Sequence, residues 1–75
     1  MVEDKVLDII AEHFDLPKET LSTETDLVAD LHGDSLDLVE LIMAFEDGFE
    51  ISIPDEVALT IRTIGEIVRY IEQAK

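Results

Sequence analysis

Apolar side chains recur at helical spacing in three stretches of the chain, the first of them over residues 2–14. One face of a helix there would carry Val2, Val6, Ile9, Ile10 and Phe14. This helix should end near Asp15 or Leu16, because Pro17 disfavours helical geometry in the residue before it. His13 borders the apolar face and is interpreted as a boundary residue rather than a metal ligand.

The second stretch predicts a helix from about Ser35 to Phe49 with two different faces. With residues placed about 100° apart, the core face holds Leu38, Leu41, Ile42, Phe45 and Phe49. The opposite face holds Leu36, Glu40, Met43 and Asp47, flanked by Asp37 and Glu46. Single exposed apolar residues are common on proteins, but an apolar centre ringed by acids is also typical of a docking surface. Both interpretations of Leu36 and Met43 stay open.

The third stretch predicts a last helix from Ile64 to about Gln73. Thr63 and Glu66 have the spacing of a capping box at its start. Its buried stripe would consist of Ile64, Ile67, Val68 and Ile71.

The segments between these helices are less regular. Residues 17–33 are rich in Ser, Thr and Asp, as expected of a loop with a short helical turn near residues 27–30. We expect four apolar residues to fix this loop to the core: Leu21, Leu27, Val28 and Leu31. After an extended link over residues 50–53, Pro54 precedes a short helix expected over residues 55–60, with Ala58 and Ile61 as its core contacts.

These patterns predict a single all-α domain over residues 1–75, with three main helices, one short helix and a long loop between the first two helices. No stretch is long enough to form a sheet. A chain of 75 residues buries only a modest core. It contains no cysteine, so neither a disulfide nor a thiolate metal site adds stability.

The chain is strongly acidic, with 19 Asp and Glu against 5 Lys and Arg and a net charge of −14. This charge argues against binding to nucleic acids or anionic membranes, which require basic surface. The charge favours protein partners with basic patches. The alternative is that the charge serves only to keep the protein soluble. The sequence has no apolar run long enough to span a membrane and no signal peptide at its start, so a cytoplasmic location is the default expectation.

Ser35 is the residue with the most distinctive position, at the start of the second helix. If Asp34 is the N-cap, the Ser35 hydroxyl is free to point outward, and Asp37 at the third helical position favours the helix dipole. If Ser35 is the N-cap, its hydroxyl accepts a hydrogen bond from the first turn of the helix and needs no further function. The local sequence leaves the two alternatives open.

Catalytic and metal sites are not supported by the sequence. Ser35 has only His32 nearby in sequence as a base, and a small helical bundle offers no cleft to enclose a substrate. The string from Gly33 to Leu36 also occurs in a family of serine esterases, but those are larger α/β enzymes with an Asp-x-x-His element that is absent here. No segment follows a calcium-loop pattern, so clustered acids such as Asp30, Asp34 and Asp37 are expected to hold cations only adventitiously.

Phosphate chemistry at Ser35 fits better, because a helix N-terminus tolerates a negatively charged phosphodiester. From Glu19 to Ile61 there are twelve acids and no Lys or Arg. A modifying enzyme would therefore have to supply basic groups or metal, and its basic patch would find a suitable target.

The segment from Asp34 to Asp37 and the run from Val39 to Glu46 resemble the acyl carrier proteins of bacterial-type fatty acid synthesis. The resemblance extends to Phe49, to residues 53–56 and to residues 63–71, and so covers nearly the whole chain. It implies an up-and-down helical bundle in which Ser35 carries 4′-phosphopantetheine through a phosphodiester. It also implies an acyl chain held as a thioester, sheltered between helices by Leu31, Ile42, Phe45, Ala58, Ile61 and Ile67.

The partners implied are a phosphopantetheinyl transferase and acyl-transfer enzymes with basic docking patches, visited by a monomeric carrier. The docking residues would be Asp34, Leu36, Asp37, Glu40, Met43, Glu46, Asp47 and Asp55. Two departures from the family pattern bear on the pathway. His32 and Gly33 stand where the family usually has Gly and a small residue, and Leu59 replaces an expected acid.

Two alternatives to a fatty acid carrier remain. The protein can be a specialised carrier for a polyketide, lipid-modification or other dedicated pathway. It can also be an unmodified acidic adaptor that keeps the fold and only binds partners.

Overall fold

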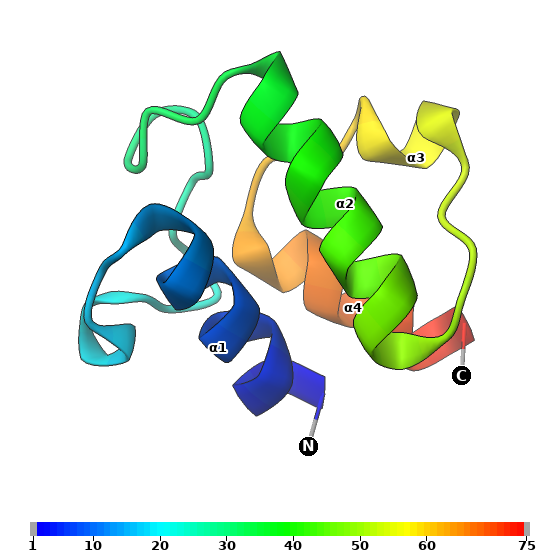
Figure 1. Ribbon diagram of the computed structural model, residues 1–75, viewed down its shortest axis with the longest axis horizontal. Helices are drawn as coiled ribbons and strands as arrows, with labels where there is room; N and C mark the ends of the chain where they lie inside the picture. Colours follow the sequence, from blue (N-terminus) through cyan, green and yellow to red (C-terminus); the bar gives the residue numbers. More distant parts are fainter. Residues whose placement is uncertain (1, 75) are drawn as a thin grey trace.

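The computed structural model describes residues 2–74, and over that range the regular secondary structure is helical (Figure 1). The three main helices are α1 (Val2–Phe14), α2 (Ser35–Phe49) and α4 (Ile64–Ala74). The short helix α3 spans Asp55–Ala58, and a 3₁₀ turn, η1, spans Lys18–Thr20. This arrangement confirms the predicted all-α class, and the first two main helices have the predicted bounds. None of the helices in residues 2–74 is long and apolar enough to cross a membrane.

The core forms where α1 packs against both α4 and α2 (Figure 1). It contains only apolar side chains, and no polar or charged residue between positions 2 and 74 is buried. The stripe predicted for α4 is fully confirmed, because Ile64, Ile67, Val68 and Ile71 are all buried. On α2 the deepest residues are Leu41, Phe45 and Phe49, whereas Leu38 and Ile42 are half-buried.

Helix α3 is shorter than predicted and packs against α2. It ends at Ala58 rather than near Thr60, and Leu59 and Thr60 continue the chain as a turn. Ile61 is buried as expected, while Ala58 is only half-buried. This segment is therefore attached to the core mainly by residues at its two ends, Ile53 and Ile61.

The long loop between α1 and α2 is fixed to the core by fewer side chains than predicted. Leu21 and Leu27 are buried and Leu31 is half-buried, but the prediction for Val28 was wrong, because Val28 is 41% exposed. Val28 points outward because it lies in the helical turn over residues 27–31, where only part of the turn faces the core. The η1 turn was not predicted from the sequence.

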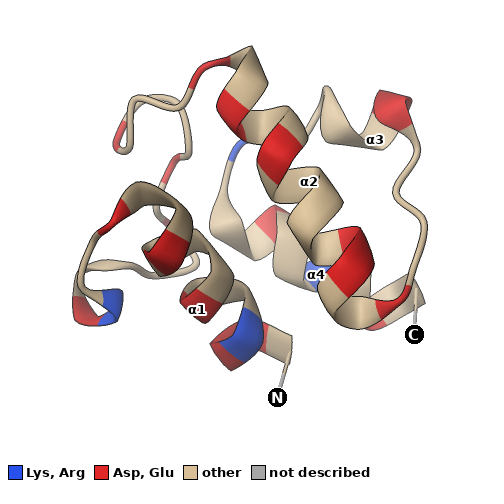
Figure 2. Cartoon of the chain, viewed as in Figure 1, with Lys and Arg blue, Asp and Glu red and all other residues tan. Residues whose placement is uncertain are grey.

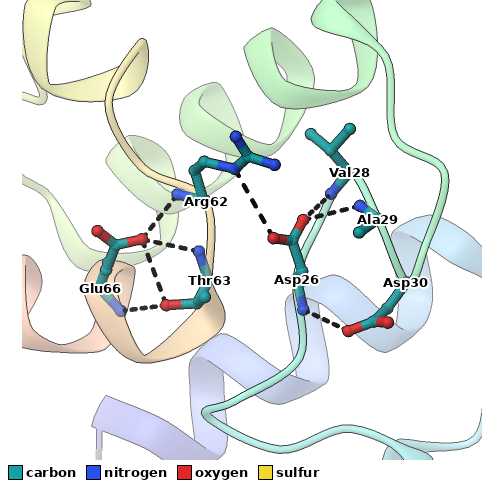
Figure 3. A network of polar contacts seen from close by, with 7 residues as sticks. All are labelled: Asp26, Val28, Ala29, Asp30, Arg62, Thr63 and Glu66. Carbon is teal, nitrogen blue, oxygen red and sulfur yellow. Dashed lines mark hydrogen bonds and ion pairs between the residues drawn. The ribbon is translucent and has the colours of Figure 1, made fainter.

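Asp26 organises the loop by hydrogen bonds to the backbone (Figure 3). Its carboxylate accepts from the N–H groups of Val28 and Ala29 at 2.8 and 2.7 Å, and its own N–H donates to the Asp30 carboxylate at 2.8 Å. Arg62, just before α4, approaches the Asp26 carboxylate at 3.7 Å. The loop is thereby connected to the start of α4, where the two segments also form an isolated β-bridge between residues 26 and 63.

The start of α4 has the predicted capping box (Figure 3). The Glu66 N–H donates to the Thr63 hydroxyl at 3.3 Å, and the Glu66 carboxylate accepts from the N–H groups of Arg62 and Thr63 at 2.9 Å each. The pKa of Glu66 is lowered by these two hydrogen bonds, and the larger effect comes from the N–H of Arg62. The pKa of Asp26 is lowered chiefly by the N–H of Ala29 and then by that of Val28.

Asp26→Asn should reduce the loss of stability at low pH. A carboxylate whose pKa is depressed in the folded state stabilises that state above the unfolded pKa of about 3.9, and this stabilisation disappears as pH falls through the folded pKa. Asparagine cannot titrate but can still accept from Val28 and Ala29. Urea unfolding followed by circular dichroism between about pH 5 and 2 should therefore show a shallower decline for the variant.

Glu24→Gln provides the control, because it removes the same charge from an exposed position of the same loop. Its decline should match that of the unmodified chain. An Asp26→Asn curve parallel to the wild-type curve would show that Asp26 does not contribute to acid unfolding.

Candidate attachment site and docking surface

The backbone that leads into α2 is held in an unusual conformation by His32 and Gly33. His32 has a left-handed φ of 57°, a region that few residues other than Gly, Asn, Asp and His occupy. The Gly33 N–H donates to the Leu27 carbonyl oxygen at 2.9 Å. A Cβ atom on Gly33 would lie 2.9 Å from that oxygen and 3.2 Å from the Phe14 ring. The chain therefore turns sharply and passes close to the loop before α2 begins.

Asp34 is the N-cap of α2, which decides between the two alternatives for Ser35. The Asp34 carboxylate accepts from the Asp37 N–H at 2.9 Å, and the Asp37 carboxylate accepts from the Asp34 N–H at 3.1 Å. Together they form a reciprocal capping box. Ser35 is the first helical residue and is exposed. Its hydroxyl is not needed to cap the helix.

Asp37 also connects α2 to α1. One of its oxygens lies 3.1 Å from His13 Nε2, near the C-terminal end of α1. The pKa of Asp37 is lowered first by the Asp34 N–H and then by the hydrogen bond with His13. Asp37 is therefore a structural residue as well as an acid beside Ser35.

The solvent-facing side of α2 combines acids with large apolar residues. Leu36 and Met43 are 64% and 62% exposed, in agreement with the predicted helical phase. Val39 is also exposed and was not included among the candidates. Figure 2 shows acidic residues along α2 and no Lys or Arg on that helix.

The predicted docking acids are not equally accessible. Asp34, Glu40, Asp47 and Asp55 are exposed. Asp37 and Glu46 are half-buried, and both have structural hydrogen bonds. The Glu46 carboxylate accepts from the Ile53 N–H at 2.8 Å and so connects α2 to the segment that leads into α3.

An open groove of about 440 Å³ lies between α2 and the α3 segment. It extends from Ser35 to the surroundings of Glu46 and Ile53. Most of its wall is apolar and comes from Leu38, Val39, Ile42, Met43, Ile53, Ala58 and Leu59. An exposed serine hydroxyl at one end of an apolar groove is a suitable position for an arm that carries a hydrophobic group.

Only two of the six residues predicted to shelter an acyl chain, Ile42 and Ala58, line this groove. Phe45, Ile61 and Ile67 lie in the core, and Leu31 is half-buried in the loop before α2. The part of the groove wall that α2 contributes could have been predicted from helical spacing. It consists of positions 35, 38, 39, 42, 43 and 46, which lie on one side of the helix. That side lies next to the core face, and it is covered in part by α3.

Comparison with known proteins identifies the class of carrier. A family model described as "Phosphopantetheine attachment site" matches residues 4–71. The chain is 47% identical over 70 residues to the acyl carrier protein of Picosynechococcus sp., an alignment that covers 93% of this chain and 86% of that protein. It is 46% identical over 71 residues to the acyl carrier protein of Syntrophobacter fumaroxidans, with coverage of 95% and 88%.

The fold, the exposed serine at a helix start and the matching family model define a phosphopantetheine-bearing carrier domain. More specifically, the chain belongs to the acyl carrier protein family. It carries acyl groups on covalently attached 4′-phosphopantetheine and is not itself a catalyst. It works with a phosphopantetheinyl transferase and with acyl-transfer enzymes.

Substitution of Asp34 and Ser35 should have different effects on stability. Asp34→Ala removes the N-cap and should lower the free energy of unfolding by about 1 kcal/mol. Ser35→Ala should change it by less than about 0.5 kcal/mol, as is usual for an exposed residue without a structural contact. Urea unfolding at neutral pH measures both values. Equal losses for the two variants would mean that Ser35 takes part in capping.

Proposed function

We propose that the Ser35 hydroxyl carries the 4′-phosphopantetheine arm, and that the protein carries acyl intermediates as thioesters in cytoplasmic fatty acid biosynthesis. One observation carries the attachment site: Ser35 is exposed at the start of α2, while Asp34 performs the capping. The hydroxyl is thus accessible, fixed in position and free of a structural hydrogen-bonding role. Of the three serines in the chain, Ser35 lies at the start of a main helix and lines the groove.

The local chemistry supports a phosphodiester at Ser35. The N–H groups in the first turn of α2 and the helix dipole favour a negative charge there. In the attachment reaction, the Ser35 oxygen loses its proton and forms a bond to the phosphorus that bears the pantetheine arm. The pyrophosphate bond of coenzyme A breaks, and 3′,5′-ADP leaves. The neighbouring acids oppose an incoming phosphate, so we expect the transferase to supply a cation or basic side chains.

The groove between α2 and α3 is the proposed shelter for an acyl chain. It begins at Ser35 and has an apolar wall, as required to keep a hydrocarbon out of water. A deeper position, toward Phe45, Ile61 and Ile67, would require α3 to move away from α2. Since α3 has only four residues, such a movement disturbs little regular structure.

The proposed docking surface consists of exposed acids and apolar residues along the solvent-facing side of α2, together with Asp55 at the start of α3. Enzymes with basic patches would be attracted by the acids, and Leu36 and Met43 would provide apolar contact at the centre. We expect the carrier to act as a monomer, because a weak and reversible encounter suits a protein that visits several enzymes. Asp37 and Glu46 are expected to contribute less than the exposed acids, because both make structural hydrogen bonds.

A specialised carrier is the second candidate, and one residue favours it. Leu59 is 85% exposed beside the groove, where the family pattern has an acid. An apolar side chain at that position changes both the charge and the hydrophobicity of the surface that a partner would contact. This change is compatible with a dedicated partner enzyme in place of the enzymes of fatty acid synthesis.

Modification by a transferase tests the attachment site. The protein, purified without its arm, should gain the mass of one phosphopantetheine when incubated with coenzyme A and a broad-specificity phosphopantetheinyl transferase. Ser35→Ala should abolish the gain. Ser52→Ala, which alters another exposed serine, should leave it unchanged. Intact-protein mass spectrometry measures each gain, and an unmodified wild-type chain would instead support an acidic adaptor.

Loading by an enzyme of fatty acid synthesis tests the pathway and the docking surface. The phosphopantetheine-bearing protein should accept a malonyl group from a bacterial malonyl transferase. Asp47→Lys on α2 should lower kcat/KM about three- to tenfold at low salt, and the difference should shrink at high salt.

Glu72→Lys is the matched control, because it changes the net charge equally but lies on α4. Its kcat/KM should stay near the wild-type value. Equal losses for the two variants would indicate a dependence on total charge rather than a docking surface. Failure of loading in a protein that has accepted the arm would favour the specialised carrier.

A further inference from the structure

Three potential metal ligands from two helices meet beside the capping box of α2. His13 lies near the C-terminal end of α1, and Asp37 and Glu40 lie one turn apart at the start of α2. His13 Nε2 is 3.1 Å from an Asp37 oxygen and 3.8 Å from a Glu40 oxygen. One ligand atom from each of the three residues lies within 4.8 Å of the other two.

We propose that His13, Asp37 and Glu40 form a binding site for a divalent transition metal ion, with Zn²⁺ as the ion that fits best. The site would connect α1 to α2 and would leave a fourth position open to water. It differs from the attachment site, because it does not include Ser35. The proposal does not rest on the proposed function.

The distances match the requirements of a small metal ion. Zinc binds imidazole nitrogen and carboxylate oxygen at about 2.0–2.2 Å, so neighbouring ligand atoms in a tetrahedral site lie about 3.4 Å apart. The separations from His13 Nε2, 3.1 and 3.8 Å, fall on either side of that value. The three ligand atoms all lie within 4.8 Å of one another, and rotation of the exposed Glu40 side chain would adjust the remaining spacing.

Asp37 is already oriented as a ligand by a second contact outside the cluster. Its other oxygen accepts from the Asp34 N–H at 3.1 Å, which fixes the carboxylate and leaves the first oxygen directed toward His13. Metal-ligating carboxylates are usually held by such hydrogen bonds. Zinc would replace the proton that His13 Nε2 shares with Asp37, and this proton would move to Nδ1 or be released to solvent. Binding would not require the capping box to open.

The ligand types favour a transition metal over Mg²⁺ or Ca²⁺. Imidazole nitrogen suits zinc and its neighbours, whereas Mg²⁺ and Ca²⁺ prefer sets composed of oxygen ligands. His13 and Asp37 are half-buried and Glu40 is exposed, so an ion has a route from solvent to the site. The net charge of −14 also favours an approaching cation.

Isothermal titration of the full chain with ZnCl₂, after removal of metals, tests the site. The wild-type protein should bind one zinc ion per chain. His13→Gln retains a group that can donate to Asp37 but lacks the imidazole, so it should weaken zinc binding at least about tenfold, as should Glu40→Gln. Circular dichroism confirms that each variant remains folded.

His32→Asn is the matched control, because it removes the other histidine and keeps a residue that tolerates the left-handed backbone. Its zinc affinity should equal that of the wild-type chain. Titration with Co²⁺ should produce visible absorption bands of a nitrogen- and oxygen-ligated ion in the wild-type chain and in His32→Asn, but not in His13→Gln. Binding should persist in a millimolar excess of Mg²⁺.

Three results would overturn the proposal. They are an absence of zinc binding at micromolar protein concentration, an unchanged affinity in His13→Gln, and complete loss of binding in excess Mg²⁺. The second and third would indicate general attraction of cations to an acidic surface. The modification of Ser35 is measured separately by mass, so failure of this site would leave that result unaffected.

Discussion

The reciprocal capping of α2 by Asp34 and Asp37 is the contact on which the functional surface depends. It fixes the first residue of the helix, and this position decides which side chains face the core, the groove and the solvent. It satisfies two backbone N–H groups that would otherwise lack partners at the helix start. Because two carboxylates perform this role, the Ser35 hydroxyl is left free for covalent chemistry. Asp37 additionally connects the capped end to His13, so that α1 supports the same site.

A second constraint is the combination of a small apolar core with a large excess of negative charge. None of the charged residues that the structure describes is buried, so the acids lie at the surface. Some of them are used locally. Asp26 accepts hydrogen bonds from backbone N–H groups within the long loop, and Glu66 does the same at the start of α4 (Figure 3). Others, such as Asp47 and Asp55, are exposed around the groove and remain available to a partner. The same composition thus supplies both structural caps and the exposed acids of the proposed docking surface.

The main helices could be predicted because each has a strong apolar period and clear start signals. The features that could not be predicted depend on how separate segments meet. Val28 is apolar like the buried leucines of its loop, so the sequence does not distinguish it from them. In the structure it lies on the outer side of a turn. The groove wall could not be assigned without the position of α3, so Leu59 was recognised only as a missing acid. His13 and Asp37 are 24 positions apart, and no local pattern indicates that they touch.

The backbone ahead of α2 also limits how this stretch of sequence can diverge. Position 32 has a left-handed conformation, which Gly, Asn, Asp and His adopt more readily than other residues. Position 33 has ordinary backbone angles but no room for a Cβ atom against the Leu27 carbonyl. Position 32 is therefore constrained by its backbone conformation and position 33 by the space around it, so their residues are not interchangeable. A substitution at position 32 by a residue that disfavours the left-handed region strains the backbone, whereas any side chain at position 33 requires the long loop to move.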